Sequence, residues 1–184
     1  MEGTMKRLAL HDRKAWVEQA PIPSAHGANV VVRLESTPIC GSDKKHFLNP
    51  DKTIRYAGHE GTGVVVEVDK SNLVKVGDRV LTNCLSGCGV CEHCRSGNYV
   101  YCENKLPMDQ MASHFCQYTI LQDFLCIPLP EDISYDMGTL AGCVLAPAFQ
   151  TLQKMQVIPS DLVMVLGCGP VGLGAITIAK HYGA

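Results

Sequence analysis

Hydrophobic and polar residues alternate in short runs along the first two thirds of the chain. The runs are rich in β-branched residues and are separated by Gly, Pro and Asn, a pattern typical of strands bounded by turns. Short strands at this spacing predict a small, barrel-like β domain. The runs expected to form strands are residues 6–10, 30–34, 63–68, 79–82 and 115–121.

The pattern changes near Cys143. Residues 144–155 have the spacing of a helix, the continuous apolar run 162–166 predicts a buried strand, and residues 171–181 predict a second helix. Gly183 follows this last helix as a candidate C-terminal cap. We therefore expect a β domain followed by the start of an α/β domain.

Composition and charge narrow the class of protein. The chain has 184 residues, of which 46% are hydrophobic and 18% charged, as in ordinary globular proteins. A net charge of -2 offers no basic surplus for phosphates, so we expect no nucleic-acid partner. The N-terminus does not resemble a secretory signal, which favours a cytoplasmic location. Glycines and Pro170 interrupt the uncharged stretch 162–179, so we expect no membrane span.

Ten cysteines without a secretory signal indicate metal ligands rather than disulfides. Cys88, Cys91, Cys94 and Cys102 form a Cys-x2-Cys-x2-Cys-x7-Cys motif within a loop that also contains glycines. Four thiolates at this spacing can close around one ion and leave no open position, as in a structural zinc site. A disulfide pair or an iron–sulfur cluster is the alternative.

A second group of potential ligands precedes the cysteine motif. Cys40 and Asp43 lie in one short segment, and His59 and Glu60 lie in another. A thiolate, an imidazole and nearby carboxylates are the mixture that a catalytic zinc uses, with three protein ligands and an open fourth position. Taken alone, the histidine could equally be an ordinary surface residue.

A glycine motif follows the apolar run 162–166. Gly167, Gly169 and Gly172, with Pro170 and Val171 between them, form a G-x-G-x-x-G pattern between the expected strand and the expected helix. In that context the helix N-terminus can face the pyrophosphate of a dinucleotide, as in the first unit of a Rossmann fold. The acidic residue that contacts the ribose would follow about 20 residues later, so the motif leaves NAD and NADP open.

Five motifs occur in a familiar order: ICGSD, GHEGTG, VGDRV, the four-cysteine motif and GCGPVG. Together they resemble the N-terminal part of the zinc-dependent medium-chain alcohol dehydrogenase family. The resemblance implies a GroES-like β-barrel catalytic domain over residues 1–145. It also implies the first strand–helix unit of a truncated Rossmann NAD(P)-binding domain over residues 146–184, with one catalytic zinc and one structural zinc.

The resemblance also implies roles for individual residues. Cys40 and His59 fall on the first two ligands of the catalytic zinc, and Glu60 falls on the adjacent carboxylate. Cys143, 24 residues before the glycine motif, is the candidate third ligand; its alternative role is a small buried hydrophobic residue. Asp43 resembles the carboxylate that orients the zinc-bound histidine.

Ser42 occupies the position of the family's substrate hydroxyl partner, which begins a proton relay. It can equally cap the helix that begins nearby. The relay often ends at a histidine, but here Lys45 stands at that spacing and His46 follows it. Residues 113–118 also depart from the family, because they replace a glycine-rich, Ala-Glu-containing segment.

The function that the resemblance implies is oxidoreduction. A small-molecule alcohol and its aldehyde or ketone would be interconverted by hydride transfer to or from NAD(P), in a parent enzyme expected to form homo-oligomers. We expect the 184-residue chain to be incomplete for catalysis. The alternatives are a non-catalytic zinc-binding structural or interaction module and, less consistent with the acidic charge, a zinc-ribbon nucleic-acid binder.

Overall fold

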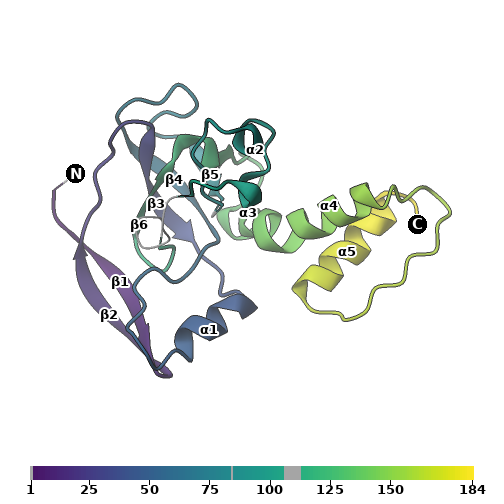
Figure 1. Cartoon of the computed structure of the whole chain (residues 1–184), viewed down its shortest axis with the longest axis horizontal. Coiled ribbons are helices and arrows are strands. Elements are labelled where there is room, and N and C mark those ends of the chain that lie inside the picture. Colours follow the sequence, from purple (N-terminus) through teal and green to yellow (C-terminus); the bar gives the residue numbers. More distant parts are fainter. Residues whose placement is uncertain (1, 84, 106–112) are drawn as a thin grey trace.

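The computed structural model describes residues 2–83, 85–105 and 113–184 (Figure 1). Two antiparallel sheets form the larger part of the molecule: a β1–β2 hairpin and a five-stranded sheet in the order β6-β3-β4-β5-β7. The strands are β1 (Thr4–His11), β2 (Lys14–Pro21), β3 (Asn29–Ser36), β4 (Gly61–Val68), β5 (Arg79–Thr82), β6 (Tyr118–Gln122) and β7 (Cys126–Pro128).

The strands confirm the expected β domain. Each run that we expected to be extended overlaps β1, β3, β4, β5 or β6, although β6 begins at Tyr118 rather than at Phe115. Two strands were not expected from the sequence. Strand β2 is largely exposed, so it lacks an apolar face, and β7 has only three residues.

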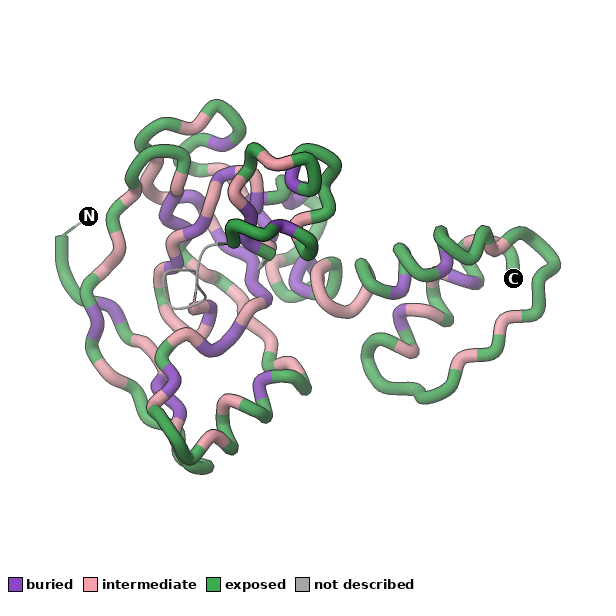
Figure 2. Tube along the Cα trace, viewed as in Figure 1, coloured by how far each residue is buried: buried purple, intermediate pink, exposed green. Residues whose placement is uncertain are grey.

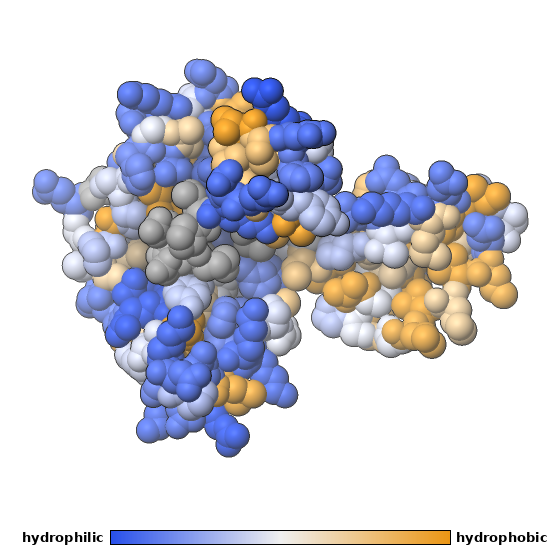
Figure 3. Space-filling view, in the orientation of Figure 1, coloured by the Kyte–Doolittle hydropathy of each residue, from blue (hydrophilic) through white to orange (hydrophobic). Residues whose placement is uncertain are grey.

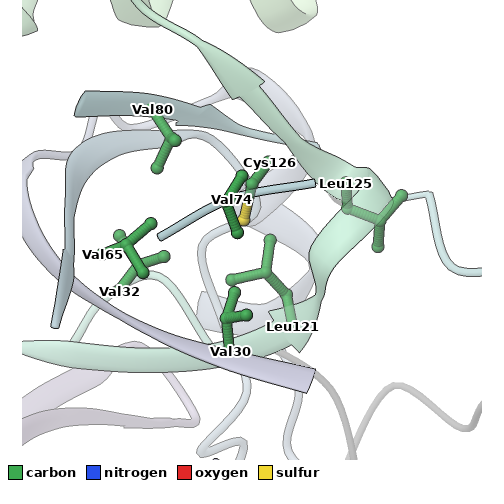
Figure 4. Close-up of a cluster of buried hydrophobic side chains, with 8 residues drawn as sticks. All are labelled: Val30, Val32, Val65, Val74, Val80, Leu121, Leu125 and Cys126. Atoms are coloured by element: carbon green, nitrogen blue, oxygen red, sulfur yellow. The ribbon is translucent and has the colours of Figure 1, made fainter. Parts of the chain in front are cut away.

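The core of the β domain lies on one face of the five-stranded sheet. Eight buried side chains meet there (Figure 4), and Val30, Val32, Val65 and Val80 are fully buried. Burying each valine stabilises the fold by about 1.5–3 kcal/mol. This core fixes the ends of β4 and β5, from which the candidate ligand loops extend.

The helices are short, and several directly adjoin one another. The helical elements are η1 (Gly41–Asp43), α1 (Lys44–Phe47), α2 (Glu92–Arg95), η2 (Tyr99–Tyr101), η4 (Asp123–Leu125), α3 (Tyr135–Leu140), the π-helical turn η5 (Ala141–Leu145), α4 (Ala146–Lys154) and α5 (Pro170–His181).

The helix expected over residues 144–155 is longer than its apolar pattern indicated. Helical structure runs through α3, η5 and α4, and it begins after Ser134, whose hydroxyl accepts a hydrogen bond from the N–H of Met137. The domain boundary expected after residue 145 lies inside this run and remains a prediction.

The C-terminal part projects from the β domain (Figure 1). Helix α5 matches the helix expected over residues 171–181, and the positive φ of Gly183 (90°) suits the expected C-terminal cap. The strand expected over residues 162–166 does not form: Leu162 and Leu166 are 101% and 88% exposed. A strand needs a neighbour to pair its backbone groups, and no described strand lies beside it.

The distribution of burial differs between the two parts. Buried residues concentrate in the β domain (Figure 2), whereas hydrophobic surface covers much of the C-terminal part in the face shown in Figure 3. Within the described residues, no helix combines the length and apolar character that a membrane crossing requires.

Candidate metal centres and dinucleotide turn

The four-cysteine motif folds into a lobe around α2 and η2. The Sγ atoms of its four cysteines all lie within 4.8 Å of one another. The backbone N–H of Cys91 donates to Cys88 Sγ (3.3 Å), and the N–H of Cys94 donates to Cys91 Sγ (3.4 Å). A third N–H, from Cys88, donates to Cys102 Sγ (3.3 Å). The turns thus direct both the sulfur atoms and the backbone donors inward.

The thiols of this lobe differ in acidity. Backbone N–H groups of Val90 and Cys91 lower the pKa of the Cys88 thiol to about 6, because they stabilise its thiolate. Burial raises the pKa of the Cys94 thiol to about 12. A set of four clustered sulfurs, two of them on buried cysteines and supplied with N–H donors, fits a tetrahedral zinc ion with no open position.

The second group of ligands is assembled from three distant segments. Cys40 precedes η1, His59 and Glu60 precede β4, and Cys143 lies in η5. One ligand atom from each of these four residues lies within 4.8 Å of the others. Cys143 Sγ is 3.9 Å from both Cys40 Sγ and His59 Nε2.

Asp43 lies beside two of these residues, His59 and Cys40. It is 4% exposed, and its Oδ1 lies 3.3 Å from His59 Nδ1. Its other oxygen, Oδ2, accepts a hydrogen bond from the backbone N–H of Cys40 (2.9 Å). The carboxylate therefore lies against the Nδ1 side of the imidazole, and through Oδ2 it fixes the loop that carries Cys40.

Glu60 brings a second buried carboxyl group to the centre. It is 6% exposed, and its Oε1 lies 3.4 Å from His59 Nε2. Burial, and then the charge of Glu60, raise the pKa of the Cys143 thiol to about 12. Two thiols and a carboxyl group in a shared, partly buried space are poorly accommodated as anions, and a divalent cation would offset that cost. The donor set therefore fits zinc.

The candidate relay residues lie on η1 and α1. Ser42 and Lys45 are exposed, whereas His46 is half-buried with its ring 5.9 Å from that of Tyr56. Burial, and then the charge of Lys45, lower the pKa of His46. The N-cap residues are Cys40 for η1 and Asp43 for α1, so Ser42 does not cap either helix.

The glycine motif forms a tight turn before α5. Gly167 has a φ of 97°, a conformation that favours glycine. A Cβ on Gly172 would lie 2.0 Å from the carbonyl oxygen of Gly167, so only glycine permits this close approach. Pro170 and Val171 open the helix, and the surroundings of Gly169 hold no atom that a Cβ would meet within 4 Å. The turn leaves room for a ligand at the N-terminus of α5.

Two structural features were missed in the sequence. The first is the set of backbone N–H groups that donate to the cysteine sulfurs. The Cys-x2-Cys spacing could have revealed it, because the N–H three positions after a cysteine donates back to that sulfur. The second feature is His114, which is 1% exposed and lies beside Gly61. The only signal for it was the unusual segment 113–118.

Comparison with known proteins gives a consistent result. Residues 26–131 match the family described as the alcohol dehydrogenase GroES-like domain. The chain is 32% identical over 183 residues to an uncharacterised zinc-type alcohol dehydrogenase-like protein, YphC, of Escherichia coli, covering 91% of this chain and 52% of the relative. It is 30% identical to D-arabitol-phosphate dehydrogenase of Enterococcus avium, covering 100% of this chain and 54% of that enzyme.

A solved structure resembles the fold over nearly the whole chain. Alcohol dehydrogenase TADH from Thermus sp. ATN1 superposes with a TM-score of 0.88 at 28% identity, covering 98% of this chain and 56% of that protein. The chain spans about half the length of the curated relatives it matches.

Proposed function

This chain belongs to the alcohol dehydrogenase GroES-like domain family, and from that premise we propose that it forms the metal-binding part of an oxidoreductase. The reaction would interconvert a small-molecule alcohol with its aldehyde or ketone, using NAD or NADP. One observation carries the proposal: Cys40, His59, Glu60 and Cys143, from three distant segments, converge within 4.8 Å.

In this proposal Cys40, His59 and Cys143 hold a catalytic zinc, and Glu60 lies beside it. When bound, the zinc supplies Lewis acidity that favours deprotonation of an alcohol. Asp43 keeps the imidazole oriented through Nδ1, as the 3.3 Å contact supports. The four-cysteine lobe would hold a structural zinc, since its four clustered ligand atoms are all sulfurs.

Proton transfer is assigned to Ser42 and His46. These residues are four positions apart across η1 and α1, a spacing that places side chains on one helical face. The lowered pKa of His46 keeps its ring neutral and able to accept a proton at neutral pH. Lys45, the alternative end of the relay, is exposed, whereas His46 is half-buried.

The glycine turn is assigned to the dinucleotide. Its open approach to the N-terminus of α5 suits a pyrophosphate, because the helix dipole and free N–H groups favour an anion. Relatives named as D-arabitol-phosphate dehydrogenase and probable D-xylulose reductase support a small hydroxylated substrate. We further propose that the whole enzyme acts in the cytoplasm as a homo-oligomer.

Cobalt spectroscopy tests the catalytic assignment without requiring turnover. The 184-residue chain would be loaded with Co²⁺, and its absorption would be followed while a small alcohol is added. A centre with an open position should change its absorption on adding alcohol, and a Cys143→Ser variant should not. An alcohol-insensitive spectrum in the loaded wild-type chain would instead favour a non-catalytic zinc-binding module.

A further inference from the structure

Residues 113–115 pack between the two loops that carry the proposed metal ligands. The backbone N–H of His114 donates to the carbonyl oxygen of Ala57 (3.2 Å), two residues before His59. The hydroxyl of Thr37, three residues before Cys40, donates to the carbonyl oxygen of His114 (3.1 Å). The backbone of one residue therefore ties the Cys40 loop to the His59 loop.

The ring of His114 makes a further link to the second loop. Its Nε2 lies 2.7 Å from Thr82 Oγ1, and this hydroxyl donates to the carbonyl oxygen of Gly61 (2.9 Å). A threonine hydroxyl has one hydrogen, and a carbonyl oxygen can only accept. With that hydrogen directed to Gly61, the pair favours a proton on Nε2 of His114 that is donated to Thr82.

Close packing restricts the same turn from both ends. A Cβ added to Gly61 would lie 2.9 Å from Cδ2 of His114, and one added to Gly58 would lie 2.7 Å from Cδ1 of Phe115. Such approaches are possible only for glycine. The His59 turn is consequently held against residues 114–115 by packing as well as by hydrogen bonds.

We propose that His114 is a positioning residue for the second metal centre. It fixes the turn that presents His59 relative to the loop that presents Cys40, without itself touching the metal or the substrate. This inference rests on the proposed function of the centre. It also gives a purpose to the segment 113–118, where the family resemblance leads one to expect glycine-rich sequence.

The test is a Co²⁺ titration of the metal-free full chain, resolving the two centres by their absorption. We expect His114→Leu to weaken binding at the second centre on the order of 10-fold, as loss of an outer-shell partner does. The four-cysteine centre should bind as before. Thr119→Val is the matched control, because this buried β6 hydroxyl has no hydrogen-bond partner among the described residues.

Two further variants separate positioning from general destabilisation. His114→Gln places an amide N–H where Nε2 donates and should restore binding, whereas Thr82→Val removes the acceptor and should reproduce the loss. Nitrogen NMR of the wild-type chain should show the Nε2-protonated tautomer of His114. Recovery by Gln in a folded protein would support positioning even if His114→Leu does not fold.

The outcomes distinguish this inference from the proposed function. Unchanged affinity and absorption at the second centre in folded Thr82→Val and His114→Leu variants would overturn the inference alone. A wild-type chain that takes up Co²⁺ only in the four-cysteine lobe would contradict the second metal centre, and the positioning role with it.

Discussion

The two candidate metal centres are built from the chain in different ways. The four-cysteine centre takes every ligand from one short loop, residues 88–102, and its backbone N–H groups donate to the sulfurs. The second centre joins three segments, with Cys40 and Cys143 separated by 103 positions. A local centre depends chiefly on its own turns, whereas a non-local centre depends on the whole fold.

The two centres also differ in the chemistry of their ligands. Four sulfurs can saturate a zinc ion, so the first centre is suited to holding a lobe together. The second combines two sulfurs, an imidazole and a buried carboxyl group, with Asp43 behind the imidazole. Its mixed donors can leave a position for substrate, which is why the catalytic proposal rests there.

Removing one sulfur from the local centre should have the largest effect on stability. Structural zinc contributes about 10–16 kcal/mol of apparent binding energy in zinc-finger peptides, and in such sites binding is linked to folding. We therefore expect Cys94→Ser to release one zinc and to unfold the lobe around α2. Hydrogen exchange measured with mass spectrometry would locate the loss. Full protection of residues 88–102 in this variant would contradict the structural role.

Substitutions at the non-local centre should separate ligands from neighbours. Cys143→Ser should abolish metal uptake there, because it removes one of three proposed ligands, while the lobe keeps its zinc. Glu60→Gln should retain the ion with an altered cobalt spectrum. Thiolate-to-cobalt absorption measures both results. Retention in Cys143→Ser together with loss in Glu60→Gln would reverse the ligand assignment.

Asp43 should change the metal affinity of the second centre without abolishing metal binding there. Replacing a carboxylate that orients a metal-bound histidine costs about 10–100-fold in metal affinity. We expect Asp43→Asn to fall in that range when affinity is measured by competition with a chelator. The exposed Asp51→Asn is the control. Equal affinities for both variants would show that the 3.3 Å contact with His59 does not support binding.

The smallest expected effect is a pH dependence from His46. Its folded pKa lies below the ordinary value of 6.5, so the unfolded chain binds more protons between the two values. Its contribution to stability is therefore present above pH 6.5 and is lost as the pH falls through the lowered pKa. Urea unfolding of the metal-free chain should show a shallower acid dependence for His46→Gln than for the exposed control His26→Gln. Identical slopes would contradict the shift.

The sequence was most informative where the interactions are local. The strand runs alternate within a few residues, and the four-cysteine motif contains its complete ligand set. Helix α5 and its preceding glycine turn are likewise local, since the turn needs only the small residues at Gly167 and Gly172. Such features depend on neighbours along the chain and were predicted with nearly the observed bounds.

Features that depend on distant partners were less predictable. The 162–166 run has the composition of a strand, but composition does not provide a neighbouring strand for its backbone. Cys143 was named only through family resemblance, and the structure brings it to Cys40 by folding η5 against the β domain. His114 was missed because Thr82 and Gly61, which define its surroundings, are far away in sequence.

We infer that this chain builds two separate metal centres, one local and one assembled by the fold. The most direct test is the zinc content of the purified chain, measured by elemental analysis together with Cys40→Ser and Cys91→Ser variants. We predict two zinc ions in the wild-type chain and one in each variant, with the double variant losing both. A single zinc in the wild-type chain, lost only with Cys91→Ser, would contradict the claim.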